Sequence, residues 1–162
     1  MTFQTADLYD RYEDRVWVCE PLFRDFGRRR AFFGQIATVK CFEDNTQVKS
    51  MLAEPGRGRV LVVDAGGSLR CAMLGDLIAK SAVTNGWAGI VLYGCVRDSE
   101  RLGRMDLGIK ALRAIPRKSV RRDEGQRNLP VSFAAVTFFP GHWAYADADG
   151  ILICASALNI EP

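Results

Sequence analysis

Three charged residues in the sequence have side chains that could act together on a substrate: Asp76, Arg97 and Asp98. Asp76 follows a glycine at the start of an apolar segment, and twenty residues separate it from the Arg97–Asp98 pair. An arginine can bind an anion through two parallel hydrogen bonds, and an aspartate offers the hard oxygen ligands that a divalent cation such as Mg²⁺ prefers. Together these side chains would suit a small anionic substrate and a metal ion.

The spacing of these residues matches one passage through a β-α-β unit. The segment LGDLIAKSAVTNG has apolar residues at helical spacing and a terminal Asn-Gly stop, and residues 88–94 (AGIVLYG) follow as a strand. In such a unit a helix of about ten residues runs back about 15 Å, and the next strand recovers that distance. Asp76 and the Arg97–Asp98 pair are therefore expected at one edge of a sheet, where open α/β sheets bind ligands.

The start of the predicted helix adds a second anion-binding element. Its backbone N–H groups lack partners within the helix and suit a carboxylate or phosphate, and the glycine allows close approach. The residues concerned are Gly75, Asp76, Leu77 and Ile78. The alternative is a purely structural role, in which Asp76 pairs with Lys80 one turn later and the Arg-Asp pair makes surface contacts. The spacing alone leaves both interpretations open.

The remaining elements indicate a mixed α/β fold. Residues 59–67 (RVLVVDAGG) form the clearest strand, since a continuous β-branched run is typical of a strand buried on both faces. A short helix capped by Thr5 or Asp7 opens the chain, and RVWVCE is extended. Further strands are predicted in FFGQIATVKCF, VSFAAVTFFPG and YADADGILICAS, the last with a turn at Asp149–Gly150, and further helices in DNTQVKSMLAEPG and MDLGIKALRAIP. The predicted fold contains a central β-α-β unit and an antiparallel C-terminal part.

Composition limits the classes of protein that the chain can represent. Its 162 residues and 18.0 kDa suit a single domain, and the 48% hydrophobic content is ordinary for a globular protein. No apolar run could cross a bilayer and no secretory signal opens the chain, so a cytoplasmic location and no membrane partner are expected. Basic residues cluster at 28–30 and 117–127, but no aromatic platform accompanies them, so direct nucleic-acid binding is not expected. The second cluster could instead contact a protein partner.

The five cysteines are predicted to be free thiols. They are widely spaced, and no Cys-x-x-Cys pair suggests a disulfide framework or a zinc site. Cys95 lies two residues before Arg97, whose guanidinium could favour a thiolate. The simpler interpretation, that Cys95 is a small packed residue, is preferred.

The chain resembles the RraA-like family, which includes the 4-hydroxy-4-methyl-2-oxoglutarate aldolases and the regulators of ribonuclease E activity. The resemblance extends almost from end to end, as one domain over residues 1–162. The segments that carry it are EPLF, GQIATVKCFEDN, GRGRVLVVDAGGS, NGWAGIVLYGCVRD, MDLGIKALRAIPRKS, VTFFPG and YADADGI. It implies a β/β/α sandwich that assembles as a ring-like homotrimer, with sites near the subunit interfaces.

The aldolase branch of this family has an acid, twenty further residues and then Arg-Asp, and this chain matches that spacing. The resemblance implies that Arg97 and Asp98 are catalytic, that Asp98 binds Mg²⁺ or Mn²⁺, and that residues 75–78 and Arg97 bind a small 2-oxo acid. The implied reaction cleaves 4-hydroxy-4-methyl-2-oxoglutarate to two pyruvates, with oxaloacetate decarboxylation through the same pyruvate enolate. The alternative is a non-catalytic protein that binds and inhibits ribonuclease E.

The chain departs from the family pattern at Gly141–His142, where Gly-Asp is expected. His142 is the only histidine, and it could titrate near neutral pH, although simple replacement of a turn acid is the preferred interpretation. If an acid at this turn supports the site, its absence would lower activity. A single histidine excludes a zinc-dependent aldolase, and Lys80 is expected to point to water, which argues against a Schiff base. A methyltransferase interpretation of VVDAGGS is rejected because G-x-G-x-x-G is absent.

Overall fold

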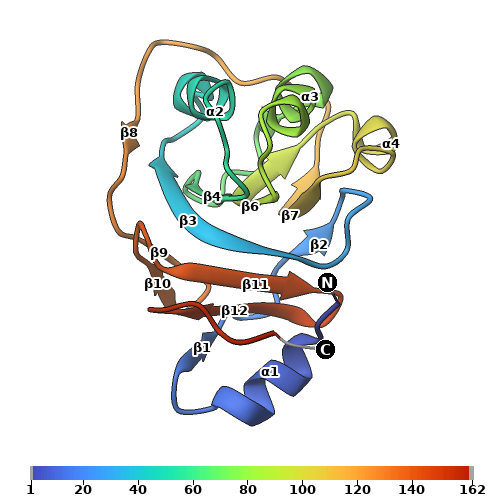
Figure 1. Cartoon of the computed structure of the whole chain (residues 1–162). Coiled ribbons are helices and arrows are strands. Elements are labelled where there is room, and N and C mark those ends of the chain that lie inside the picture. The colour runs from blue at the N-terminus through green and yellow to red at the C-terminus, as the bar shows by residue number, and fades with distance from the viewer. Residues whose placement is uncertain (1, 161–162) are drawn as a thin grey trace.

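One long strand joins the two halves of the molecule. The structure is a computed structural model that describes residues 2–160. Strand β3 (Phe32–Lys40) pairs antiparallel with β11 (Trp143–Asp147) along residues 32–35, and then parallel with β4 (Val60–Asp64) along residues 36–40. Figure 1 shows β3 curving between an upper group of strands under three helices and a lower group above α1. The expected β/β/α sandwich is thus confirmed.

The upper half is a largely parallel sheet, in the order β3-β4-β6-β7-β2. Strands β4, β6 (Gly89–Val96) and β7 (Gly108–Ala114) run parallel, and β2 (Arg24–Asp25) closes the edge antiparallel. Residues 60–63 of β4 are completely buried, as expected for a β-branched strand covered on both faces. Two short strands lie off this path, with β5 (Ala72–Leu74) beside β6 and β8 (Gln126–Arg127) beside β3.

The helices of the upper half cover one face of this sheet (Figure 1). They are α2 (Thr46–Leu52), α3 (Asp76–Thr84) and α4 (Ser99–Leu102). The predicted β-α-β unit is confirmed, because α3 connects the upper strands and β4 and β6 lie side by side in parallel. A core of buried aliphatic side chains fills the space between these helices and the sheet.

The lower half is antiparallel, as predicted for the C-terminal part. Strand β12 (Gly150–Cys154) pairs with both β11 and β1 (Val16–Val18), and the β11–β12 hairpin turns at residues 148–149. The stretch predicted as one strand in VSFAAVTFFPG is instead a hairpin of β9 (Val131–Phe133) and β10 (Val136–Phe138). It turns at Ala134 and Ala135, which both have positive φ. Helix α1 (Thr5–Tyr12) packs beneath this half.

The prediction of a helix in MDLGIKALRAIP is wrong, because this segment contains β7. Met105, Ile109 and Leu112 have helical spacing, and Lys110 reads as part of a polar face. Lys110 is in fact 3% exposed, and its Nζ lies 3.0 Å from Asp25 Oδ1. Residues 108–111 are all buried beside β6, and a side chain at Gly108 would collide with the ring of Phe32. The pattern of apolar residues around a buried, ion-paired lysine is thus the same as that of a helix with an exposed polar face.

The predicted cap of the first helix also needs correction. The N-cap residue is Gln4, and neither Thr5 nor Asp7 caps the helix with its own side chain. Thr5 instead donates its N–H and its hydroxyl to the carboxylate of Asp147, at 2.7 and 2.6 Å. No helix in the described residues is long and apolar enough to span a membrane.

Candidate active site

The structure brings Asp76, Arg97 and Asp98 to one edge of the upper sheet. Strand β5 ends at Leu74, one residue before Gly75, and the Arg97 N–H donates to the carbonyl of Leu74 at 2.9 Å. The Asp98 Oδ2 accepts the backbone N–H of Asp76 at 3.0 Å. The predicted outward and return path through α3 and β6 is therefore confirmed. Along this path, sequence reasoning missed the short strand β5, which lies between β4 and α3.

Gly75 lies against the Arg-Asp pair. A Cβ at this position would lie 2.9 Å from Asp98 Oδ2 and 3.4 Å from Arg97 Nε. The backbone of Gly75 is extended, with φ −127° and ψ −169°, so the need for glycine here is steric and not conformational. Asp98 itself adopts the left-handed conformation, with φ 57° and ψ 39°, a backbone state that is uncommon for residues other than glycine. Functional sites often retain strain of this kind.

Asp76 pairs with Arg101 of α4, not with Lys80 of its own helix. The Arg101 Nη1 lies 3.0 Å from Asp76 Oδ2, while Lys80 is exposed and makes no ion pair within the described residues. The predicted ion pair between Asp76 and Lys80 is therefore wrong. Of the four N–H groups predicted to be available at the helix start, that of Asp76 is already used by Asp98. Those of Leu77 and Ile78 remain as first-turn donors.

The surroundings of Asp98 keep its carboxyl group ionised. The hydrogen bond from the Asp76 backbone lowers the pKa of Asp98, against the opposing effect of partial burial, and the guanidinium groups of Arg97 and Arg101 lower the pKa further. An ionised carboxylate is the form that binds a cation. Asp98 is therefore in the state that a metal ligand requires, with one of its two oxygens oriented by the helix start.

A cavity of about 510 Å³ opens at this edge of the sheet. Its volume lies within the range of small-molecule sites. It is lined by the start of α3, the residue that follows β6, part of the basic loop at 117–127, and one residue each from β5 and the start of α2. The lining residues are Asn45, Ala72, Gly75, Asp76, Leu77, Ile78, Arg97, Lys118, Ser119, Val120 and Arg121. All the predicted site residues except Asp98 line the cavity, and Asp98 contacts Asp76 beside it.

Sequence reasoning missed the contribution of residues 118–121, which it assigned to a surface for a protein partner. One end of this loop is held by β5, because the Ala72 N–H donates to the carbonyl of Arg117 at 2.7 Å. Farther along, Asn45 accepts a hydrogen bond from Arg121 Nε at 3.0 Å and donates to the carbonyl of Met73 at 3.3 Å. No local signal in the loop indicates these long-range contacts.

Asp44 fixes the middle of the basic loop. Its carboxylate accepts the N–H and hydroxyl of Thr46, and also the N–H groups of Arg122 and Glu124. Burial alone would raise the pKa of Asp44, but these hydrogen bonds outweigh it and lower the pKa to about 2. Asp44 is 2% exposed, so the loop is tied to the start of α2 by a buried charge.

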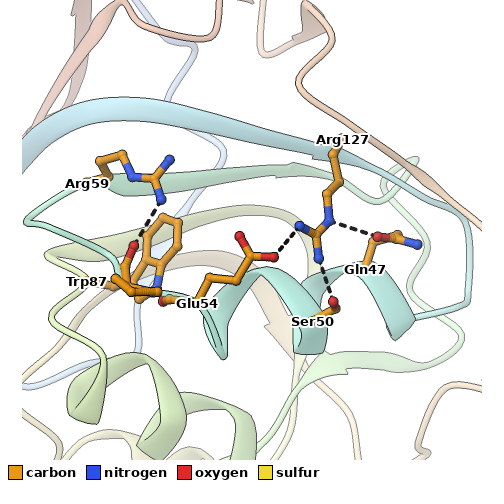
Figure 2. Close-up of polar contacts among 7 residues, drawn as sticks. Gln47, Ser50, Glu54, Arg59, Trp87 and Arg127 are labelled. Atoms are coloured by element: carbon orange, nitrogen blue, oxygen red, sulfur yellow. Dashed lines mark hydrogen bonds and ion pairs between the residues drawn. The ribbon is translucent and has the colours of Figure 1, made fainter.

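The far end of the loop is fixed to the side of α2. Figure 2 shows Arg127 reaching three acceptors, Gln47, Ser50 and Glu54, with 2.9 Å to Gln47 Oε1 and 2.6 Å to Glu54 Oε1. Because Asp44, Asn45 and Arg127 act at successive points, the basic loop is anchored along most of its length. A loop held in this way can position side chains as a helix or strand would.

Two other residues singled out in the sequence lie away from the cavity or are buried. Cys95 is 0% exposed, and burial raises the pKa of its thiol, so a reactive thiolate at Cys95 is wrong and the packed interpretation is correct. The other four cysteines are also free and buried. His142 lines a separate hollow of the lower half with Trp17 and Phe139.

The glycines of VVDAGGS do not form a cradle for a nucleotide-like cofactor. A Cβ at Gly66 would lie 2.7 Å from the ring of Phe42, and one at Gly67 would lie 2.9 Å from the ring of Tyr93. Both glycines have positive φ, and β5, not a helix, follows this turn. They therefore serve a turn that packs under aromatic rings, and not the helix start that binds phosphates in dinucleotide-binding folds.

Comparison with known proteins agrees with this architecture. The profile of the RraA-like family (Aldolase/RraA) matches residues 5–153. A curated relative from Xanthomonas campestris pv. campestris (strain B100), named "Putative 4-hydroxy-4-methyl-2-oxoglutarate aldolase", is 54% identical over 161 residues, which cover 99% of this chain and 96% of the relative.

Two solved structures have nearly the same fold. One, described as an S-adenosylmethionine: 2-dimethylmenaquinone methyltransferase from Geobacillus kaustophilus HTA426, has a TM-score of 0.95 and 42% identity over 99% of both chains. The other, described as the RNA-processing inhibitor RraA from Thermus thermophilis, has a TM-score of 0.94 and 40% identity, and it covers 99% of this chain and 97% of that one. By sequence and by fold, this chain belongs to the RraA-like family.

Proposed function

We propose that the protein is a divalent-metal-dependent lyase that cleaves 4-hydroxy-4-methyl-2-oxoglutarate to two pyruvates and also decarboxylates oxaloacetate. The observation that carries the proposal is the convergence of Asp76, Arg97 and Asp98 on the glycine-led start of α3. A protein that only binds a partner has no chemical need for this arrangement. The aldolase name of the 54% identical relative supports the same reaction class.

Each residue of the site has a distinct task in this proposal. The free N–H groups of Leu77 and Ile78 bind the carboxylate next to the 2-oxo group, and Gly75 lets that carboxylate approach the backbone. Arg97 offsets the negative charge that develops on the 2-oxo oxygen as the pyruvate enolate forms. The cavity lining contains no histidine, so we assign the proton transfers to a water molecule in the cavity.

The acidic residues present suit a weakly ligated Mg²⁺ or Mn²⁺. The described residues contain no group of three or more His, Cys, Asp or Glu that could enclose a metal. Mg²⁺ commonly binds proteins through one or two carboxylates and keeps the rest of its oxygen ligands from water and substrate. Asp98 would hold the cation, with Asp76 beside it. A cation bound there would supply Lewis-acid polarisation of the 2-oxo group.

Two apolar side chains that line the cavity are exposed. Leu77 is 79% exposed and Val120 is 57% exposed, although both are apolar and line the cavity. Apolar side chains exposed around a site often mark a surface that a partner covers. We propose that a neighbouring subunit covers them, which would also exclude water from the bound substrate.

The test is a pyruvate-release assay with both substrates, with Mg²⁺ or Mn²⁺ and after chelation. We expect Arg97→Ala to lower kcat by about a thousandfold, as loss of a charge-stabilising donor does. We expect Asp98→Ala to abolish most of the activity, and the activity that remains should no longer depend on the metal. Lys80→Ala is the matched control, since Lys80 is an exposed cation on the same helix that makes no ion pair in the described residues. Absent turnover in the wild type, or turnover indifferent to both site variants, would overturn the proposal.

A second function, binding and inhibition of ribonuclease E, is supported by one comparison. The solved structure that is 40% identical to this chain is described as an RNA-processing inhibitor. The basic loop is the surface we propose for such a partner, because Arg117, Arg121 and Arg122 are exposed while its backbone is fixed. The same Arg97→Ala protein separates the two functions, since the loss of catalysis should leave any inhibition of the ribonuclease unchanged.

A further inference from the structure

Ser119 has a buried hydroxyl group without a partner, and the residue lines a cavity. The residue is 8% exposed, and its Oγ makes no hydrogen bond in the described structure. Leaving a buried hydroxyl unpaired costs free energy that a well-packed protein ordinarily avoids. Ser119 belongs to the lining of the candidate active site. A ligand atom bound in that cavity could satisfy the hydroxyl.

Two cations flank Ser119 in the same lining. Lys118 and Arg121 both border the cavity, and neither makes an ion pair within the described residues. Arg121 uses its Nε to reach Asn45 at 3.0 Å, which orients the guanidinium and leaves its two Nη groups for a ligand. A hydroxyl donor between two cations is a combination suited to a carboxylate.

Most of the acids near this group have other partners. Lys118 also borders a smaller hollow that contains Glu43, Asp44 and Glu124. Glu43 is paired with Arg70, and Asp44 accepts N–H groups of the loop backbone. Near the start of α3, Asp76 pairs with Arg101, and Asp98 has one oxygen bonded to a backbone N–H and is assigned to the cation.

We propose that Lys118, Ser119 and Arg121 form a second anion subsite, which binds the carboxylate at the far end of the substrate. This inference rests on the proposed lyase function. The start of α3 and Arg97 bind the 2-oxo acid end, and the loop residues line the same cavity. The subsite determines specificity, because it favours 2-oxo acids with a second carboxylate over those with an apolar tail.

The two proposed reactions should depend differently on this subsite. In the aldol cleavage the C4 hydroxyl loses its proton, the C3–C4 bond breaks, and its electron pair passes to C3 to form the pyruvate enolate. C4 becomes the ketone of the second pyruvate, so its neighbouring carboxylate stays anionic throughout. In oxaloacetate the far carboxylate leaves as neutral CO₂, and a cation that binds it does not favour that step. Loss of the subsite should therefore impair aldol cleavage more than decarboxylation.

The experiment compares two inhibitors of equal length, 2-oxoglutarate and 2-oxopentanoate, of which only the first has a far carboxylate. We expect wild type to bind 2-oxoglutarate at least about tenfold more tightly by calorimetry. Ser119→Ala and Arg121→Ala should each lower the affinity for 2-oxoglutarate by about tenfold and change the affinity for 2-oxopentanoate by no more than about twofold. They should lower kcat/KM for 4-hydroxy-4-methyl-2-oxoglutarate more than kcat/KM for oxaloacetate. Equal affinity of the two inhibitors for wild type would overturn the inference.

Arg122→Ala is the matched control. It removes the same charge from the next position, but its side chain borders the neighbouring hollow and not this cavity. If Arg122→Ala lost as much affinity for 2-oxoglutarate as Arg121→Ala, the binding would depend on the general positive charge of the loop and not on a specific subsite. That result would overturn the inference. Ser119→Ala should not lower Tm, because it removes an unpaired buried hydroxyl. A marked fall in Tm would assign Ser119 a structural role instead.

Failure of the lyase proposal can be told apart from failure of the subsite. If wild type cleaves neither substrate, the proposed reaction is wrong, but the calorimetric comparison of the two inhibitors still decides whether a far carboxylate is bound. If wild type is active and the variants affect both inhibitors alike, the reaction stands and the subsite is wrong.

Discussion

The two halves of the molecule carry hollows of similar size but different chemistry. The cavity at the edge of the parallel half measures about 510 Å³, and the hollow of the antiparallel half measures about 550 Å³. Cationic side chains and the start of a helix line the first. The second is lined mainly by aromatic and small side chains, with His142 the only titratable residue among them. Size alone would not identify the active site, whereas converging polar groups do.

The difference follows from how the strands of each half are connected. In the parallel half a helix starts beside the ends of the strands, so unpaired N–H groups and the residues after β6 meet at one edge. In the antiparallel half short hairpins join β9 to β10 and β11 to β12, and the start of α1 beside the end of β11 is already occupied by the protein's own Asp147 carboxylate. The antiparallel half stabilises the fold without supplying an anion site.

A matched pair of aspartates provides the strongest test of this comparison. Asp44 in the parallel half accepts two loop N–H groups and both donors of Thr46, while Asp147 in the antiparallel half accepts both donors of Thr5 and the N–H of Asp149. Either change to alanine should lower the free energy of unfolding by about 3 kcal/mol, because backbone donors lose a charged acceptor. Only Asp44→Ala should also raise KM. Chemical denaturation and the pyruvate-release assay measure the two effects.

The stabilisation by Asp44 should depend on pH in a defined window. Its pKa is lowered to about 2 in the folded protein, so its contribution is complete above the ordinary pKa near 4 and is lost as pH falls from about 4 to about 2. The difference in unfolding free energy between wild type and Asp44→Ala should therefore shrink across that window. A difference that stays constant from pH 7 to pH 2 would contradict the role assigned to this carboxylate.

Much of the site could be predicted because its residues are linked by one local unit. Asp76, Arg97 and Asp98 are separated only by α3 and β6, whose lengths follow from the apolar pattern. The continuous apolar run of β4 could also be predicted as a strand from the sequence. In contrast, β7 was predicted as a helix, since the sequence does not show that Lys110 is buried against Asp25.

The loop side of the cavity could not be predicted for a similar reason. Lys118 and Arg121 lie in a basic stretch that is typical of a solvated loop, and their place in the cavity depends on Asn45, more than seventy residues earlier. Nothing in the sequence distinguishes Ser119 from other loop residues, and its burial is known only from the structure. Contacts between distant segments leave no periodic signal in the sequence.

A smaller expected effect concerns the fit between Gly75 and the Arg-Asp pair. Gly75→Ala would place a Cβ 2.9 Å from Asp98 Oδ2, so the carboxylate or the helix start must shift. We expect kcat/KM to fall by about tenfold to a hundredfold with little change in stability. Gly103→Ala is the control, because Gly103 has helical φ and ψ and a Cβ there makes only ordinary contacts. Equal activity of the two variants would show that the approach at Gly75 is unimportant.

The smallest effect is expected at His142, where sequence comparison suggested a missing acid. Its ring lies 4.9 Å from that of Phe139, in the hollow of the antiparallel half, and it is not part of the cavity that contains Arg97. Restoring the acid with His142→Asp should therefore leave kcat/KM within about twofold, as surface changes away from a site usually do. The measurement is a steady-state assay with both substrates between pH 6 and 8. An increase of several-fold would mean that the antiparallel half supports the chemistry after all, and that the two halves are less independent than their connections indicate.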